Sequence, residues 1–214
     1  MGEKALRLWP EFIKKLSTPV FFQQTGSLIV AFDQDIAALK QFTSRLKGLD
    51  YSEFDLQQIQ QLEPELNSRL KKGLFLPNEG QLDNRQLLQA MAIEIGKNDV
   101  TWHTDSMVKT ADQTVWVNNK ELTDYDWVID CRGMGLQQDQ SESVTQTQSN
   151  KQLRGVRGEV IRVFAPEVVL QRPVRLMHPR YPIYIAPKEN HHFVIGATQL
   201  ESEDQRKPTV RSAL

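Results

Sequence analysis

Cysteine is nearly absent from this chain of 214 residues, in which Cys131 is the only one. A single thiol excludes an internal disulfide framework, and neither a Cys pair nor a His-x-x-x-His spacing offers the usual zinc ligands. We therefore expect a reducing compartment, the cytoplasm. The adjacent His191 and His192 invite a metal, but successive strand residues point to opposite faces of a sheet. The polar residues before this pair favour a hairpin turn instead.

Long hydrophobic runs and an excess charge of one sign are also lacking. The longest apolar runs, residues 27–32 and 127–131, are far shorter than the roughly 20 residues that cross a bilayer. The first residues lack the apolar stretch of a secretory signal. The net charge is −1, from 26 Lys+Arg and 27 Asp+Glu, so we expect neither a nucleic acid nor an anionic membrane as a partner.

Short motifs that identify a catalyst on their own are missing. The chain has no Gly-x-Ser-x-Gly, no Gly-x-x-x-x-Gly-Lys and no complete Gly-x-Gly-x-x-Gly. The run Gly133-Met134-Gly135 is the nearest approach to the last of these, and it can equally be the turn that ends a strand. Composition and spacing alone therefore do not reveal a reaction.

Apolar residues at helical spacing predict four helices. The first opens the chain around Leu6 to Leu16, with Pro10 either in its first turn or at a kink. The second follows Asp33 or Asp35 and stops at Gly48. A short third helix is capped by Asp55, and the fourth runs from Arg85 to Ile95 after Asp83 or Asn84.

Short β-rich runs dominate the second half of the chain and also flank Thr25-Gly26. We expect strands at residues 20–22, 27–32, 100–104, 107–110, 114–117, 127–131, 159–164, 174–177, 183–186 and 192–197. These runs predict an α+β fold with a largely antiparallel or mixed sheet and flanking helices. Residues 137–152 are almost all polar, which predicts a mobile surface loop.

Several runs, taken in order, resemble one family of enzymes. They are T-G-S-L-I-V-A (25–31), G-L-F-L-P-N-E-G-Q-L-D (73–83), D-W-V-I-D-C-R-G (126–133), L-R-G-V-R-G-E (153–159), Y-I-A-P-K (184–188) and V-I-G-A-T (194–198). They are similar to motifs of the FAD-dependent amine and amino-acid oxidoreductases of the D-amino-acid oxidase family. Glycine oxidase of the thiamine-biosynthesis type is the subfamily that they resemble most.

The resemblance implies a division of the chain and a partial cofactor site. Residues 20–98 and 150–200 correspond to the family's substrate-binding sheet and helices, and residues 99–135 to a remnant of its FAD-binding domain. The family's pyrophosphate-binding Gly-x-Gly-x-x-Gly would precede Met1, and its Gly-x-Arg-Pro motif would follow Leu214. We therefore expect a central fragment of an FAD-dependent oxidoreductase that has little activity and few cofactor contacts on its own.

The resemblance assigns residues of the substrate pocket, each by its position in a matching motif. Tyr184 matches a tyrosine that binds or orders the substrate, although tyrosine is also a common strand residue. Gln199 follows G-A-T at a pocket-lining position, where glycine oxidase has an apolar residue. Arg180 is a further pocket candidate, whereas the neighbouring Arg172 and Arg175 are interpreted as a solvated strand edge.

Cofactor contacts are carried over in the same way. Ser106 and Met107 match a position whose backbone contacts the adenine end of FAD, or they simply begin a strand. Gly133 fits a close approach of the chain to the cofactor, because it has no side chain. Arg132 faces either the FAD phosphates or solvent. Cys131 matches the same contact, and we expect its thiol to be a small buried apolar group rather than a redox centre.

Three functions are consistent with these observations. The resemblance favours oxidation of a small amine or amino acid by transfer of a hydride to the flavin. It leaves open whether the enzyme is a homo-oligomer. A quinone-linked dehydrogenase of the same fold is a second reading. A noncatalytic sheet module that binds a peptide or a subunit is the third, and the reading frame upstream of Met1 separates it from the other two.

Overall fold

The computed structural model describes residues 2–111, 114–123, 125–135, 154–179 and 183–204. The chain divides into two compact units. The first unit contains residues up to 98 and residues 158–200, and the second contains residues 99–157 and 201–205. The polar segment 137–152 and Arg180 lie outside the described residues.

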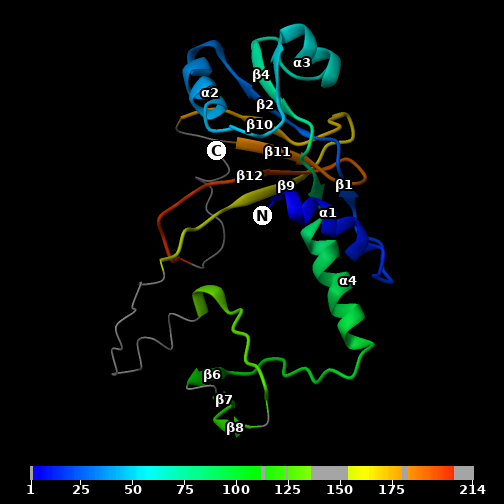
Figure 1. The fold of residues 1–214 in the computed structure, drawn as a ribbon, viewed down its shortest axis with the longest axis vertical. Coiled ribbons are helices and arrows are strands. Elements are labelled where there is room, and N and C mark those ends of the chain that lie inside the picture. Colours follow the sequence, from blue (N-terminus) through cyan, green and yellow to red (C-terminus); the bar gives the residue numbers. More distant parts are fainter. Residues whose placement is uncertain (1, 112–113, 124, 136–153, 180–182, 205–214) are drawn as a thin grey trace. The chain divides into compact units, whose positions relative to one another are not determined.

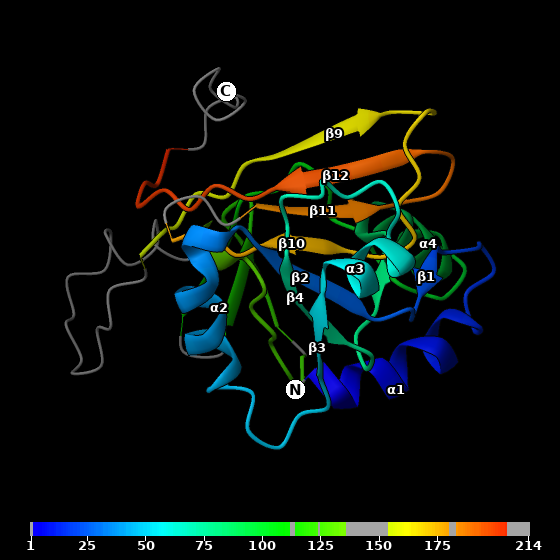
Figure 2. The same cartoon turned by 90° about the horizontal axis from the view of Figure 1, so that it is seen from above.

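A seven-stranded mixed sheet forms the centre of the first unit. Its strands, in spatial order, are β3 (Ser52–Asp55), β4 (Lys72–Leu76), β2 (Ser27–Ala31), β10 (Val174–Leu176), β11 (Ile183–Pro187), β12 (His192–Gly196) and β9 (Val160–Phe164). Figure 2 shows the last four strands side by side. Among the described strands of this sheet, only β2 and β10 pair in parallel. The predicted α+β class with a mixed sheet is confirmed.

Four α-helices accompany this sheet (Figure 1). They are α1 (Gly2–Ile13), α2 (Ile36–Thr43), which follows the 3-10 turn η1 (Asp33–Asp35), α3 (Leu56–Leu62) and α4 (Asn84–Gly96). The caps follow from the sequence. Asp55 and Gln58 form a reciprocal capping box at α3, and the Asp83 carboxylate accepts hydrogen bonds from two backbone N–H groups of α4.

Gly26 explains why the connection between the first two strands is so tight. The strand predicted at 27–32 forms as β2 in the large sheet, whereas the one predicted at 20–22 is shifted to β1 (Phe22–Gln23), which pairs with β5 (Gln81–Leu82). Gly26 has φ +75°, and a Cβ at this residue would lie 2.6 Å from Phe75 Cε2. A side chain therefore fits neither the conformation nor the space.

Both faces of the sheet are packed near β2 and β4. The cluster on the α2 side contains Ile29, Ala31, Leu39, Leu46, Leu74 and Leu76. The cluster on the α3 side contains Leu28, Val30, Ile59, Leu70 and Val174. A third cluster of Val20, Leu87 and Ala90 packs against the partly buried Trp9 and Ile13 of α1. The core is thus concentrated at the β2 side of the sheet.

Arg172 corrects the interpretation of a solvated strand edge. Its side chain lies in the first unit and is buried, and its Nε donates to Oε1 of Glu63 at 2.7 Å. Glu63 is fully buried and also accepts from the backbone N–H of Gln171. A further Arg172 nitrogen donates to the carbonyl of Thr25. This arginine is therefore an internal tie between α3 and the segment that leads into β10.

The second unit contains a small antiparallel sheet. Its strands are β6 (Val108–Ala111), β7 (Thr114–Val117) and β8 (Lys120–Leu122). Asn118 and Asn119 both have positive φ and form the turn between β7 and β8, as their residue types predicted. A short 3-10 turn, η2 (Gly133–Gly135), follows later in the chain.

The strand expected at 127–131 is not formed, and the prediction was wrong. Trp127 is 86% exposed and Ile129 is 83% exposed. Cys131 is exposed as well, which contradicts the expectation of a buried thiol. An apolar strand needs neighbours that take its hydrogen bonds and cover its side chains. Within the described residues, no strand pairs with this segment.

The expected strand at 100–104 is also missing, whereas the runs at 159–164, 174–177, 183–186 and 192–197 all contain strands. The hairpin between β11 and β12 turns at Asn190 and His191, both of which have positive φ. In the part of the chain that the structure describes, no helix is long and apolar enough to cross a membrane.

Candidate functional site

The face of the sheet that carries Tyr184 is packed at one end and open at the other. Directly opposite residues of neighbouring strands share a face, and one such row runs Ile29, Arg175, Tyr184, Gly196 and Val160. Ile29 is 4% exposed, whereas Val160 is 46% exposed. We call this row the Tyr184 row. Its open part begins at Arg175, where the core cluster under α2 ends.

Gly196 gives the Tyr184 side chain its place on this face. A Cβ at Gly196 would lie 3.4 Å from the Tyr184 hydroxyl oxygen and 2.6 Å from Cγ1 of Val160. The hydroxyl therefore lies across β12, above the glycine, and the half-buried ring stays on the open face. This explains why the V-I-G-A-T run has a glycine here, since any larger residue would displace Tyr184 or Val160.

Two of the motif runs meet at the same end of the sheet. The backbone N–H of Glu159 donates to Oγ1 of Thr198 at 2.9 Å, and the N–H of Thr198 donates back to the carbonyl of Glu159 at 3.2 Å. Gln199 follows directly and is exposed. The structure thus brings the R-G-E and G-A-T runs together, with the exposed Gln199 next to them.

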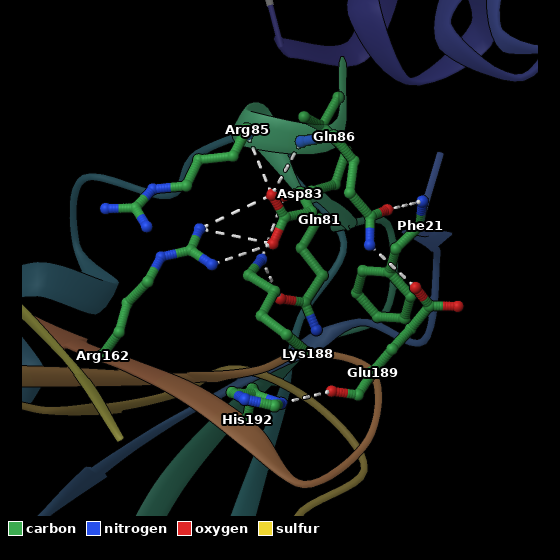
Figure 3. Close-up of polar contacts among 10 residues, drawn as sticks. Phe21, Gln81, Asp83, Arg85, Gln86, Arg162, Lys188, Glu189 and His192 are labelled. Atoms are coloured by element: carbon green, nitrogen blue, oxygen red, sulfur yellow. Dashed lines mark hydrogen bonds and ion pairs between the residues drawn. The ribbon is translucent and has the colours of Figure 1, made fainter. Parts of the chain in front are cut away.

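A polar cluster around Asp83 joins β9 to the start of α4 (Figure 3). Arg162 lies on β9, two residues from Val160 and therefore on the same face, and its guanidinium pairs with the Asp83 carboxylate at 3.3 Å. Lys188 directly follows β11, and its ammonium group donates to the Gln81 side chain and the Leu82 carbonyl. The aspartate of the 73–83 run therefore has a structural task, because it both caps α4 and holds an arginine of the sheet.

Burial and hydrogen bonding in this cluster shift two pKa values. Burial alone would raise the pKa of Asp83, but hydrogen bonds from the N–H groups of Gln86 and Arg85 and from the Arg162 guanidinium together lower it. Burial lowers the pKa of Lys188, and the charge of Asp83 opposes part of that effect. The cluster is thus built around a carboxylate that is stabilised in its charged form.

In the second unit, Asn118 engages the backbone at the predicted adenine contact. The N–H of Met107 donates to Oδ1 of Asn118 at 2.9 Å, and the N–H of Asn118 donates to the carbonyl of Met107 at 2.8 Å. The Ser106 hydroxyl donates to the carbonyl of Thr104. Both peptide groups of Met107 thus have partners within the chain, and a cofactor contact at this position would have to involve Ser106 or displace Asn118.

Arg132 is engaged within the chain rather than directed at solvent. Its guanidinium pairs with Asp130 at 2.6 Å and donates to the carbonyl of Val108 and to Oγ1 of Thr110. The hydrogen bonds from Arg132 lower the pKa of Asp130 to about 2. The arginine therefore fastens the turn before Gly133 to β6, and its role is that of an anchor.

The turn at Gly133 has open space around its backbone. Gly133 has φ +57°, and a Cβ there would meet no atom within 4 Å. The exposed Cys131 lies two residues before it. An open turn without a side chain lets a nucleotide approach the backbone closely. Gly133 therefore stays a candidate for the predicted cofactor contact.

The sequence-predicted residues fall into two groups. Tyr184 and Gln199 belong to the first unit, whereas Ser106, Met107, Cys131, Arg132 and Gly133 belong to the second. Sequence reasoning missed Gly196 as the support of Tyr184. It interpreted Arg175 as solvated, and this residue is exposed, although β10 lies inside the sheet and not at its edge. The V-I-G-A-T run already contained the signal for Gly196.

Comparison with known proteins agrees with the resemblance of the motifs. The family model described as FAD dependent oxidoreductase matches residues 1–213. A Rhizobium etli protein named as the thiamine biosynthesis oxidoreductase ThiO is 36% identical over all 214 residues, which cover 57% of that protein. The chain thus spans little more than half the length of this relative.

Solved structures share the fold. The glycine oxidase from Geobacillus kaustophilus has a TM-score of 0.77 at 16% identity over 99% of this chain and 58% of its own. The iminodiacetate oxidase from Chelativorans sp. BNC1 has a TM-score of 0.70 at 17% identity, over 98% of this chain and 59% of its own. The motifs, their arrangement in the fold and the matched family model together show that this chain belongs to the family of FAD-dependent oxidoreductases.

Proposed function

We propose that the complete protein that contains this chain oxidises a small amine or amino acid with FAD as its electron acceptor. The observation that carries this proposal is the Tyr184 row, where a phenol group lies over a glycine on an open sheet face. A hydrogen-bonding group above a flat apolar floor suits a small ligand that has one polar end.

In this proposal, the first unit supplies the substrate-side wall and the second unit contributes to the cofactor site. FAD, when bound, would accept a hydride from the substrate carbon that carries the nitrogen. Tyr184 would donate a hydrogen bond to the substrate carboxylate and so orient that carbon. Gln199 and Arg180 would line the same pocket, while Ser106, Cys131 and Gly133 would contact the nucleotide.

Relatives support the substrate class without fixing it. The names of two fold relatives refer to the oxidation of glycine and of iminodiacetate, both of them small amines that carry a carboxylate. Another fold relative is an L-proline dehydrogenase from P. horikoshii, with a TM-score of 0.71. We propose the oxidase reaction in the cytoplasm, and we treat the choice of oxygen or a quinone as electron acceptor as a question for experiment.

The test is anaerobic reduction of the complete, purified protein by candidate substrates. Bleaching of the flavin absorbance by glycine, sarcosine, iminodiacetate or a D-amino acid is the expected result. Reoxidation by air with release of hydrogen peroxide identifies an oxidase, whereas reoxidation by a quinone analogue alone identifies a dehydrogenase. A protein that binds FAD but is reduced by none of these amines would contradict the proposal.

The 214-residue chain by itself gives a second test. Because the peptide groups of Met107 and the Arg132 guanidinium are engaged internally, we expect this chain to purify colourless. An absorbance spectrum between 350 and 500 nm would check this. Stoichiometric yellow colour would show that the chain holds the flavin without the regions that its relatives have in addition.

A further inference from the structure

We infer that a groove in the first unit binds an organic ammonium ion whose body is apolar or aromatic. The groove has a volume of about 1110 Å³, and it is lined by residues of α1, β1, β5, segment 48–50 and the turn between β4 and β5. We call it the α1 groove. None of the described residues that line it belongs to the Tyr184 row. The site therefore lies apart from the one proposed for the substrate.

One part of the lining is apolar. Leu6 and Trp9 line the groove from α1. Phe22 and Leu82, directly opposite each other in β1 and β5, line it from the two-stranded sheet. Gly80 lets the helix approach this sheet closely, because a Cβ at Gly80 would lie 3.0 Å from Cδ2 of Leu6. The groove thus offers an indole ring and a phenyl ring, with leucine side chains beside them.

The charged part of the lining is mainly negative. It contains three carboxylates, those of Glu3, Asp50 and Glu79, and one cation, Arg7. Arg7 pairs with Glu3 at 2.6 Å within α1. In the part of the chain that the structure describes, Asp50 and Glu79 form no ion pair. The groove therefore has two carboxylates that no cation of the first unit neutralises.

Hydrogen bonds hold both carboxylates at the turn between β4 and β5. The Glu79 side chain accepts from the Ser27 hydroxyl, and the Glu79 carbonyl accepts from the N–H of Gly26 at 3.0 Å. Asp50 accepts through Oδ2 from the side-chain nitrogen of Asn78 at 2.8 Å. Within the described residues, the second oxygen of each carboxylate makes no hydrogen bond. One oxygen thus fixes each side chain, and the other can face a ligand.

An ammonium ion with an apolar body matches both parts of this lining. A cation is attracted to the face of an aromatic ring within about 6 Å of its centre, and indole is the best of these rings. A cleft whose charges have one sign also concentrates ions of the opposite sign. The apolar body removes the leucines and rings from water. A neutral molecule gains only this last contribution, and an anion is repelled, so the groove selects for positive charge.

The experiment measures ligand binding to the complete flavoprotein by isothermal titration calorimetry. Benzyltrimethylammonium is the cationic probe, and benzyl alcohol is its uncharged counterpart. The flavin absorbance is recorded in parallel, because a ligand beside the flavin changes it. The variants are Asp50→Asn, Glu79→Gln and the two together, each of which keeps the shape of the side chain and a hydrogen-bond acceptor. Glu53→Gln is the matched control, because Glu53 is an exposed carboxylate of β3 outside the groove.

We expect each single variant to weaken binding of benzyltrimethylammonium about two- to fivefold, the range of exposed charge pairs. The double variant should weaken it by about tenfold, since both charges are lost. Added salt should weaken cation binding to the unmodified protein by screening. Benzyl alcohol binding should change little in every variant, and the Glu53→Gln control should bind both probes like the unmodified protein. The flavin absorbance should stay constant throughout the cation titration.

Four outcomes would overturn the inference. Absence of saturable binding would show that the α1 groove takes no organic cation in the complete protein. Equal cation affinity in the double variant and in the Glu53→Gln control would place the probe away from Asp50 and Glu79. An equal loss of cation and benzyl alcohol binding would show that these two side chains only support the shape of the groove. A change in flavin absorbance that follows the binding curve would place the cation beside the flavin.

Discussion

Replacing Arg172 by alanine should destabilise the first unit strongly. The change leaves Glu63 fully buried without the Nε donor at 2.7 Å, and it removes the hydrogen bond to the Thr25 carbonyl. The guanidinium also lies 5.8 Å from the centre of the Phe75 ring, a contact that is lost as well. Breaking one partner of a buried pair costs about 3–5 kcal/mol of the free energy of unfolding. For a protein of this size, that corresponds to a fall in Tm of roughly 6–20 °C.

Thermal unfolding followed by circular dichroism is the measurement, with Arg175→Ala as the matched control. Surface changes away from special features usually stay within about 0.5 kcal/mol, so the exposed Arg175 should shift Tm little. The double variant Glu63→Met with Arg172→Met should be less destabilised than the sum of the single changes, because it leaves no buried charge without a partner. If Arg172→Ala unfolds at the same temperature as Arg175→Ala, the burial of this ion pair is misjudged.

Three more predictions concern the sheet face. Tyr184→Phe should weaken substrate binding in the complete enzyme by about tenfold, since one hydrogen bond to a charged group is lost, whereas Tyr51→Phe should not; equal KM values would make Tyr184 only a strand residue. Gly196→Ala should cost about 1–3 kcal/mol in unfolding experiments and also raise KM, because its Cβ crowds the Tyr184 hydroxyl; unchanged KM would argue against this placement. Asp83→Asn should keep the α4 cap but lose the ion pair with Arg162. Asp83→Ala should lose the cap as well, which lowers the free energy of unfolding by about 1 kcal/mol more. The pKa of Asp83 is lowered in the fold. Its contribution to the free energy of unfolding is therefore complete above the pKa of an unfolded aspartate and is lost as the pH falls through the lowered value. If the free energy of unfolding of Asp83→Asn falls as steeply at acid pH as that of the unmodified protein, the Asp83–Arg162 pair does not stabilise the fold.

Local rules were sufficient for much of the fold. The caps at Asp55 and Asp83 could be predicted because a cap depends on residues within one helical turn. The strands at 108–111, 114–117, 160–164, 174–176, 183–187 and 192–196 could be predicted from short β-rich runs, and the Asn118 turn from the tolerance of asparagine for positive φ. The resemblance located Tyr184 and Gly196 in motifs, although the contact between them required the register of β11 and β12.

Long-range partners explain where the sequence predictions failed. Arg172 was interpreted as solvated because its partner, Glu63, lies 109 residues away in the chain. The apolar run at 127–131 predicted a strand, but a strand also depends on neighbours that no local pattern contains. Arg175 was interpreted in the same way, and its side chain is exposed as expected, whereas that of Arg172 is buried.

The exposed segment around Trp127 has a practical consequence for handling this chain. Trp127 and Ile129 form an apolar stretch that is open to water, and such a stretch can pair with the same segment of another molecule and initiate aggregation. Asp126 precedes it with a negative charge, which opposes stacking of identical chains in the way that gatekeeper residues do. The chain should therefore stay dispersed best at low salt and neutral pH, where this repulsion is screened least.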